Sequence, residues 1–294
     1  MITKSKYLSI GHCCHDKVGE GYVLGGTTSY ASMLAHRLGA EPSILTSTGN
    51  DFLFDQRFKD HGLSVFNVPA AHTTVFENKY NGDHRTQTIL ARASTISNMD
   101  FQKLDQDFDI IHLSPIADEI DWSLLSQLGD SNLTLATPQG WLRQWDKEGK
   151  VSYKEMDWSL LSGVDFVVIS EEDVPNLDDQ IRDIIRAVDT LIVTKGAKGS
   201  VVYSNKVEAD FPAYPSKIVD PTGAGDTFAT GFILRYAQTK EIVDSMIFAN
   251  CLASICIEHI GTSFYDHIED IDQRMSIYKE TLLNLNATAP VKIK

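Results

Sequence analysis

The sequence predicts an α/β fold: a mostly parallel central sheet with helices on its faces and a small β-sheet projecting from it. Short apolar runs alternate with helix-like stretches along most of the chain, which is the pattern of a parallel sheet covered by helices. One segment of about thirty residues breaks this alternation and has no helical period. The 294 residues suffice for one large domain with a substantial core, and no repeat, low-complexity tract or linker divides them. We therefore expect a single domain over residues 1–294.

The first elements follow one another as in a parallel α/β unit. The apolar run YLSIG at Tyr7–Gly11 predicts a buried strand. A helix is expected over Thr27–Leu38, ending before a glycine at position 39. A strand at Ser43–Thr48 and a short helix at Asp51–His61 continue the alternation.

Two segments, approximately 12–24 and 63–93, interrupt the pattern. The runs SVFNV, TTVFENKY and HRTQTILA in the second segment are rich in β-formers and predict antiparallel strands, with a turn at Asn81-Gly82. One interpretation is a peripheral hairpin. The alternative, which we favour, is a small β-sheet that forms a lid over a substrate site.

The alternation resumes after the second segment. Strands are expected at Phe108–Leu113, Leu133–Ala136, Phe166–Ile169 and Leu191–Thr194, followed by a hairpin of Gly199–Ser204 and Val207–Phe211. Helices are expected at Trp122–Leu128, Asp157–Leu161, Asp178–Ala187, Ala224–Gln238, Ile242–His259 and Ile271–Leu283, with a frayed tail at Asn286–Lys294.

Composition narrows the classes of function. A net charge of −14 disfavours a nucleic-acid partner, which calls for clustered Lys and Arg. No run of roughly 18 apolar residues is present to span a membrane. The chain starts without the apolar h-region of a signal peptide, so we expect a cytoplasmic protein. The four cysteines, Cys13, Cys14, Cys251 and Cys256, lack a zinc spacing and are interpreted as reduced structural residues.

The segment DPTGAGDTFATGF, Asp220–Phe232, carries the most chemical information. Its small residues Gly223, Ala224 and Gly225 directly precede a helical pattern, so backbone N–H groups at a helix N-terminus can approach an anion closely. Asp226 falls in the first helical turn. There it acts either as a cap or dipole partner, worth about 1 kcal/mol, or as a general base beside a bound phosphoryl group. The co-occurrence of glycines, Asp220 and a long helix favours the base.

This segment resembles the signature of the ribokinase/PfkB carbohydrate-kinase family, D-x-x-G-A-G-D followed by an aromatic residue and a glycine. The resemblance implies a three-layer α/β/α sandwich with a β lid, and ATP-dependent phosphorylation of a hydroxyl on a sugar or sugar-like polyol, with Mg²⁺. It makes Asp226 the catalytic base and the backbone of Gly223–Asp226 the anion hole. It also places Asp220 and Thr222 in a loop that often binds a monovalent cation, such as K⁺.

The substrate side shows a second resemblance. Gly25-Gly26 before a helix is similar to the family's first motif, although a simple turn would show the same pair. The family often has asparagine about five residues later, where Tyr30 lies here, and this disfavours ribose-like recognition. Asp16, which follows the first strand, resembles the family aspartate that binds substrate hydroxyls; a carboxylate can accept from two O–H donors. A solvated turn residue is the alternative for Asp16.

The prediction of residues that bind the phosphate donor rests on weaker sequence patterns. VTKGAKG resembles the segment beside ATP and makes Thr194 and Gly196 candidates for contacts to phosphate or ribose. FANCLASICIEHIG resembles the helix at the adenine pocket, with Asn250 as the candidate. SEED aligns with the family's N-x-x-E motif, so Ser170 and Asp173 would organise Mg²⁺ through water, although both residues differ from the motif.

The segment TPQGWLR follows a strand and resembles a PQG-x-x-R stretch in relatives that include inositol kinases. Arg143 would then hold a phosphate or a substrate oxygen, while a surface turn is the alternative. This segment favours a hexose or a cyclitol such as myo-inositol over ribose. Two other functions stay open: a vitamin kinase acting on pyridoxal or hydroxymethylpyrimidine, and a non-catalytic sensor of sugar or nucleotide. Exposed lid edges favour a homodimer through the lid.

Overall fold

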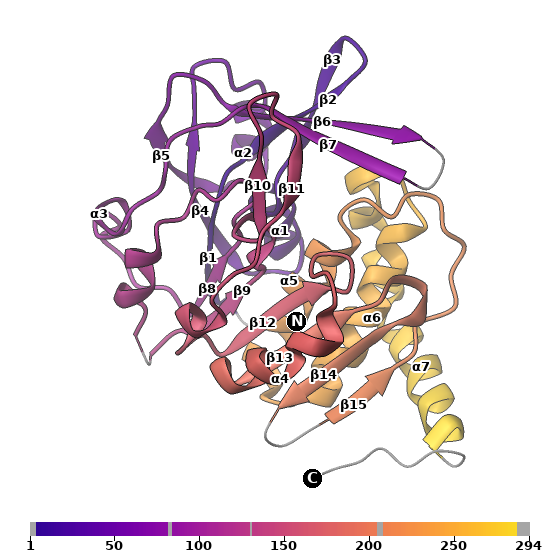
Figure 1. The fold of residues 1–294 in the computed structure, drawn as a ribbon. Helices are drawn as coiled ribbons and strands as arrows, with labels where there is room; N and C mark the ends of the chain where they lie inside the picture. The colour runs from indigo at the N-terminus through magenta and orange to yellow at the C-terminus, as the bar shows by residue number, and fades with distance from the viewer. Residues whose placement is uncertain (1–3, 82–83, 130, 205–207, 287–294) are drawn as a thin grey trace. The chain divides into compact units, whose positions relative to one another are not determined.

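The computed structural model describes residues 4–81, 84–129, 131–204 and 208–286. Over these residues the chain divides into two compact units. The N-terminal unit comprises Lys6–His36 and Ala40–Asp157, drawn from indigo to magenta in Figure 1. The C-terminal unit consists mainly of Arg37–Gly39 and the described residues from Trp158 onward, drawn toward yellow. The single domain expected from the sequence stays a prediction.

Five parallel strands form the base of the N-terminal unit: β1 (Lys6–Ile10), β4 (Glu41–Thr48), β5 (Ser64–Pro69), β8 (Ile110–Leu113) and β9 (Leu133–Ala136). They pair in the order β9-β8-β1-β4-β5. In the central strand β1, the side chains of Tyr7, Leu8 and Ile10 are fully buried. Parallel strands are covered on both faces and therefore appear in a sequence as apolar runs, which explains why most of these strands could be predicted.

The segments predicted to form the lid contain a separate sheet of four strands, called the lid below: β2 (Cys14–Val18), β3 (Gly21–Gly25), β6 (Thr74–Asn81) and β7 (His84–Ala91), labelled together in Figure 1. Its role as a cover over a substrate site stays a prediction. Its order is β3-β2-β6-β7, with β2 antiparallel to β3, and β6 antiparallel to β7. The central pair β2 and β6 is parallel. The predicted turn at Asn81-Gly82 extends into residues 82–83, which lie outside the described residues.

The prediction that the run SVFNV forms a lid strand is wrong. These residues form β5, which pairs in parallel with β4 from Ser43–Ser64 to Thr48–Pro69. The strand lies at the edge of the base, and its residues alternate between exposed and half-buried. Such alternation is typical of a half-covered antiparallel strand, so the sequence pattern was misleading. The second lid segment therefore begins at Thr74 instead of residue 63.

The remaining elements of the N-terminal unit are short, apart from one helix. They are α1 (Thr27–Arg37), α2 (Asp55–Asp60), α3 (Asn98–Phe101), η1 (Trp122–Gln127), η2 (Pro138–Gly140), β10 (Arg143–Trp145) and β11 (Val151–Tyr153). The first helix begins and ends close to its predicted bounds. The predicted helix at residues 122–128 is a 3₁₀-helix, and the antiparallel pair of β10 and β11 was not predicted.

Four strands and their helices form the C-terminal unit: β12 (Phe166–Ser170), β13 (Thr190–Thr194), β14 (Ser200–Ser204), β15 (Glu208–Phe211), α4 (Leu177–Ala187), α5 (Ala224–Thr239), α6 (Ile242–Ile257) and α7 (Ile271–Asn286). Strands β12 and β13 are parallel, and β13, β14 and β15 pair antiparallel in that order. Three short 3₁₀ segments complete the unit: η3 (Trp158–Leu161), η4 (Gly196–Lys198) and η5 (Gly261–Asp270). The hairpin and the three long helices match the sequence prediction closely. The tail predicted to fray lies almost entirely outside the described residues.

The four cysteines are buried free thiols, as expected. Burial raises the pKa of the Cys13 thiol to about 11 and those of Cys251 and Cys256 to about 12. Such thiols are inert as nucleophiles at neutral pH. Within the described part of the chain, none of the helices combines the length and apolar composition that crossing a bilayer requires.

A buried histidine gives the N-terminal unit a defined pH dependence. The imidazole of His112 lies 2.6 Å from Tyr7 Oη through Nδ1 and 3.0 Å from Thr137 Oγ1 through Nε2. Burial lowers the pKa of His112 from 6.5 to about 3, because the charged ring would lose its hydration. The folded chain therefore keeps this ring neutral over a pH range in which the unfolded chain protonates it.

Stability should consequently fall as the pH drops from about 6.5 toward 3, by about 1.4 kcal/mol per pH unit for this group. Urea unfolding at about pH 7 and about pH 5.5 should show that the wild type loses about 1 kcal/mol more than His112→Gln does. Equal losses in the two proteins would show that His112 does not control the acid sensitivity. Other titrating groups contribute to both proteins alike and cancel in this comparison.

Candidate active site

Asp16 and Gly25 lie against one another on the paired lid strands β2 and β3. A side chain built on Gly25 would collide with a carboxylate oxygen of Asp16 and come within 2.7 Å of its Cγ. Glycine at this position therefore leaves the space that the carboxylate occupies. Asp16 itself is half-buried.

The next glycine shapes the entry into α1. Gly26 has φ +92°, and a side chain there would collide with the carbonyl oxygen of His12. Its own carbonyl accepts from the amides of Ser29 at 3.0 Å and Tyr30 at 3.3 Å, while Ser29 Oγ donates to Gly25 O at 2.9 Å. Tyr30 is half-buried in the first turn of α1. The pair of glycines thus forms a tight, backbone-bonded turn next to Asp16.

Arg143 reaches the same neighbourhood from a distant part of the sequence. Its Nη1 donates to Ile116 O at 2.9 Å, and its guanidinium carbon lies 5.7 Å from the ring centre of Phe76 on lid strand β6. Burial is the main cause that raises the pKa of the Cys14 thiol. The charge of Asp16 raises this pKa further, and the charge of Arg143 lowers it. Phe76 is also the register partner of Asp16 in the parallel pair of β2 and β6, so Arg143 and Asp16 both lie beside Phe76. The predicted substrate-binding residues of the N-terminal unit come together in the fold.

The predicted anion hole, called the anion cradle below, falls on Gly223–Asp226 at the start of α5 in the C-terminal unit. Gly223 occupies the cap position with φ +78°, and the first helical bond runs from Thr227 N to Gly223 O at 2.8 Å. The first N–H groups of a helix have no helical acceptor and carry the positive end of the dipole. Gly225 is exposed, and a side chain built on it would meet nothing within 4 Å. The first turn, which includes Ala224 and Asp226, is thus open to a ligand in front of Gly225.

Asp220 orders the loop before this helix. Its Oδ1 accepts from Thr222 N at 2.9 Å and its Oδ2 from Gly261 N at 3.1 Å. Burial alone would raise the pKa of Asp220, but these hydrogen bonds outweigh it and lower the pKa below its ordinary value. The amides of Val219 and Asp220 also donate to Ile257 O, at 2.7 and 3.1 Å. The loop is therefore preorganised by its own backbone bonds, and a monovalent cation at Asp220 and Thr222 stays a prediction.

The other donor-side candidates have defined but local roles. Asn250 is 7% exposed; its Nδ2 donates to Ser200 Oγ at 3.0 Å and to Met246 O at 2.8 Å. Thr194 Oγ1 donates to Ile169 O at 3.3 Å, while Gly196 has φ +52° and open space beside it. The amide of Asn250 therefore links α6 to β14, and Gly196 leaves room for a close ligand.

Ser170 and Asp173 form a capped turn after β12. Asp173 Oδ2 accepts from Ser170 N at 3.1 Å, and Glu171 pairs with Lys198 at 3.1 Å. Among the residues that the structure describes, no group of three or more His, Cys, Asp or Glu side chains could hold a metal ion. The turn offers only hard oxygen donors, which suits Mg²⁺ that keeps most of its water and binds donor phosphates.

Sequence reasoning missed a buried carboxylate that organises the root of the lid. Glu119 is fully buried; its oxygens accept from His12 N at 2.8 Å, Ile116 N at 3.0 Å and Ala117 N at 2.6 Å. It thereby fixes the loop after β8 to the residues that lead into lid strand β2. An acidic residue in IADEID carries no sequence signal for burial, so this role could not have been predicted.

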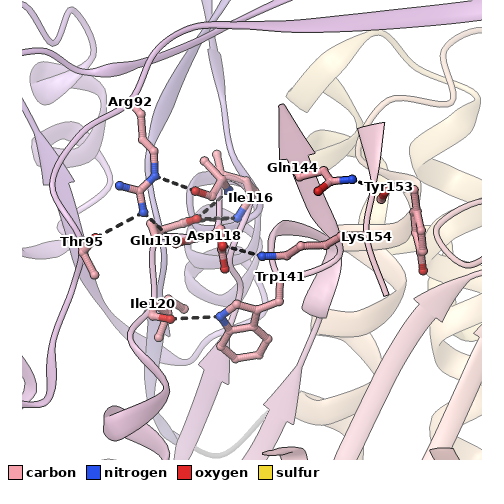
Figure 2. Close-up of polar contacts among 11 residues, drawn as sticks. Arg92, Thr95, Ile116, Asp118, Glu119, Ile120, Trp141, Gln144, Tyr153 and Lys154 are labelled. Atoms are coloured by element: carbon pink, nitrogen blue, oxygen red, sulfur yellow. Dashed lines mark hydrogen bonds and ion pairs between the residues drawn. The ribbon is translucent and has the colours of Figure 1, made fainter. Parts of the chain in front are cut away.

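Arg92 binds the same loop from the end of β7, as Figure 2 shows. Its Nε donates to Ala117 O at 2.8 Å, and its Nη2 donates to Asp118 O at 2.7 Å. In the same view, Lys154 reaches Asp118 Oδ2 at 2.6 Å and the Trp141 indole donates to Ile120 O at 3.0 Å. The loop over residues 116–120 is thus held from several sides.

Comparison with known proteins agrees with this geometry. The profile of the pfkB family carbohydrate kinase matches residues 18–268. Inositol 3-kinase of Arabidopsis thaliana is 26% identical over 282 residues, which cover 90% of this chain and 77% of the relative. The nucleoside kinase of Methanocaldococcus jannaschii is 23% identical over 251 residues, which cover 81% of this chain and 80% of the relative.

Solved structures confirm the fold. A pyrophosphate-dependent kinase of the ribokinase family, complexed with a pyrophosphate analog and myo-inositol, matches with a TM-score of 0.76 at 22% identity, over 90% of this chain and 99% of that one. Ribokinase of Thermotoga maritima matches with a TM-score of 0.72 at 17% identity, over 92% and 99%. The α/β fold with a mostly parallel sheet is therefore confirmed, as is the resemblance found in the sequence.

Proposed function

The chain belongs to the PfkB family of carbohydrate kinases and is a phosphotransferase, and from this premise we propose that it phosphorylates a hydroxyl of a cyclitol such as myo-inositol with ATP. The family and its named relatives support a ribokinase-family kinase that acts on a sugar, polyol or nucleoside. The cyclitol and the residue roles that follow are part of the proposal.

The grouping of Asp16, Gly25 and Arg143 is the observation that carries the proposal. A carboxylate can accept from two O–H donors, and a guanidinium donates through several N–H groups in a fixed plane. Together they match a ring that presents neighbouring hydroxyls, each of which both donates and accepts. The similarity of PQGWLR to inositol-kinase relatives and the name of the Arabidopsis relative support the cyclitol.

The chemistry assigned to the C-terminal unit is phosphoryl transfer. Asp226 accepts the proton of the acceptor hydroxyl as its oxygen bonds to the γ-phosphorus, while the bond from that phosphorus to the ADP oxygen breaks. Amides at the start of α5 stabilise the charge on the transferring group. Mg²⁺, when bound with the donor near Ser170 and Asp173, would neutralise phosphate charge. Thr194 and Gly196 would contact the donor, and Asn250 would shape the adenine pocket.

Two features bear on the alternatives. The four-stranded lid speaks against a vitamin kinase, because such relatives usually lack lid strands. Nucleoside kinases among the relatives keep a nucleoside as the second candidate substrate. The homodimer expected through the lid stays a prediction; Val18, Tyr22 and Val23 are exposed on β2 and β3 and available to such an interface.

Turnover across a substrate panel tests the proposal. Product formation is measured with Mg²⁺ and either ATP or pyrophosphate, against myo-inositol, fructose, ribose, nucleosides, pyridoxal and hydroxymethylpyrimidine. We expect turnover with ATP that is highest for myo-inositol. A preference for nucleosides would replace the acceptor in the proposal, and turnover with pyrophosphate alone would replace the donor. ATP binding without transfer to any acceptor would contradict both.

A further inference from the structure

Apart from Arg143 at its start, the β10–β11 hairpin, residues 143–153, has no role in the proposed chemistry. Its turn is stabilised by Asp146, whose Oδ1 accepts from Glu148 N at 3.1 Å and Lys150 N at 2.8 Å, and whose carbonyl accepts from Gly149 N at 3.0 Å. Strand pairing from Arg143–Tyr153 to Trp145–Val151 completes it. The tip is therefore a preformed turn held by its own hydrogen bonds.

This tip is bonded to the lid. Ile89 N on β7 donates to Gly149 O at 2.8 Å, and Thr88 and Lys150 form an antiparallel bridge. Strand β7 is the last strand of the lid sheet, so the tip covers part of an edge that would otherwise be open. Gly149 has φ +79°, and a side chain built on it would collide with Ile89 O. Glycine is required here both by the conformation and by the close approach of two backbones.

Apolar packing strengthens the same contact. Trp145 and Val151 pack against a buried cluster formed by Cys14, Phe76, Ile89, Ile116 and Ala117. Three members of this cluster belong to the lid strands, and two belong to the loop after β8. The β10–β11 hairpin thus contacts the lid and its base at the same time.

The other end of the β10–β11 hairpin is anchored on the base. Arg143 Nη1 donates to Ile116 O at 2.9 Å, and Lys154 Nζ reaches Asp118 Oδ2 at 2.6 Å. Figure 2 shows Lys154 pointing from the hairpin to Asp118, next to the contacts that Arg92 makes with the same loop. Asp118 has φ +54°, a conformation that needs such support in a residue other than glycine.

We propose that the β10–β11 hairpin is a strut that holds the lid at the position where Asp16 and Arg143 bind one acceptor molecule, with Gly149 as its positioning residue. This inference rests on the proposed acceptor site. Asp16 lies on a lid strand and Arg143 on the hairpin, so the distance between their charged groups depends on the contact at Gly149.

Gly149→Ala tests the strut. The new methyl group would meet backbone instead of a flexible side chain. The backbone segments at Gly149 and Ile89 must therefore separate, and the bond from Ile89 N to Gly149 O must break. The segment that contains Ile89 should lose protection from hydrogen exchange. The acceptor KM should rise about fivefold, and the donor KM should stay unchanged.

Gly62→Ala is the matched control. Gly62 also has positive φ, +64°, and lies in the same unit, but a side chain there would meet nothing within 4 Å. The control should show the same backbone strain. Protection of Ile89 from hydrogen exchange and the acceptor KM should both stay at their wild-type values. If both variants raise the acceptor KM alike, strain alone explains the effect and the strut is refuted.

A reversible crosslink gives a second test that does not depend on the fold tolerating one variant. Thr88 and Lys150 form a non-hydrogen-bonded antiparallel pair, the close spacing that a disulfide can span. In the Gly149→Ala background, Thr88→Cys and Lys150→Cys are combined. Oxidation to the disulfide should bring the acceptor KM back to the wild-type value, and reduction should raise it again. No restoration on oxidation would overturn the strut.

Hydrogen exchange separates this inference from the proposed function. The exchange at Ile89 is measured without turnover, so it reports the contact whatever the acceptor is. Gly149→Ala could lose protection at Ile89 while its KM for the acceptor that the panel identifies stays unchanged. This result would refute the positioning role. It would leave the kinase assignment intact.

Discussion

Asp226→Asn should lower kcat by about 10²- to 10⁴-fold and leave the fold intact. Asparagine has nearly the same shape as aspartate but cannot take a proton from the acceptor hydroxyl. Asp226 lies in the first turn of α5, where the proposed anion cradle would hold the transferring group. Steady-state turnover with saturating donor and acceptor measures the loss, and urea unfolding measures the fold.

Asp178→Asn is the matched control for this substitution. Asp178 is also an aspartate in the first turn of a helix of the C-terminal unit, α4. Its replacement removes the same favourable interaction with a helix dipole, which costs at most about 1 kcal/mol of stability. Turnover should stay at the wild-type level. If Asp226→Asn behaved like this control, Asp226 would be a capping residue and the base would have to be sought elsewhere.

Gly25→Ala should raise the acceptor KM by about 10- to 100-fold, the loss expected for one or two charge-assisted hydrogen bonds. The new methyl group would collide with the end of the Asp16 side chain and come within 2.9 Å of Cys14 Sγ. Both neighbours are side-chain atoms instead of backbone, so we expect the fold to survive while the carboxylate is displaced; urea unfolding checks this. The donor KM should stay unchanged. Asp16→Ala should show a similar loss, and the double variant should be scarcely worse than either single one.

Gly21→Ala on the same strand is the control for this effect. A side chain there would meet only Val18 O, at 3.9 Å, which is ordinary contact. The acceptor KM should be that of the wild type. Additive losses in the double variant of Gly25 and Asp16 would contradict the account, because two independent effects add whereas one shared effect does not.

The sequence was most informative where burial is continuous. The strands β1, β8, β9, β12 and β13 were found near their predicted places because apolar runs are typical of strands covered on both faces. The long helices α5 and α6 were equally clear. The start of α5 could be predicted as a local feature, because the small residues and the helix that follows them are adjacent in sequence. Anion binding there stays a prediction.

The sequence was least informative where partners are distant. Strand β5 was assigned to the lid because an edge strand of a parallel sheet alternates like a hairpin strand. The β10–β11 hairpin was missed because its strands have three residues each and few apolar side chains. Its tip is stabilised by a close approach of Gly149 to Ile89, sixty positions earlier, which no local pattern contains.

The candidate site shows the same division. Asp16, Gly25 and Arg143 were each proposed from local motifs, but only pairing of β2 with β3 reveals that Gly25 makes room for the Asp16 carboxylate. The buried role of Glu119 depends on three backbone amides from two loops. A charged residue in a polar stretch gives no sign of such a role before the fold is known.

Single-turnover product analysis tests the central claim most directly. Wild-type protein in excess over Mg·ATP is mixed with myo-inositol, and the products are resolved by phosphorus NMR alongside Asp226→Asn. The account predicts one phosphomonoester of the polyol for each ADP formed by the wild type, and almost none by the variant in the same time. Equal amounts of ADP and free phosphate without a phosphorylated polyol, or undiminished transfer by Asp226→Asn, would contradict it.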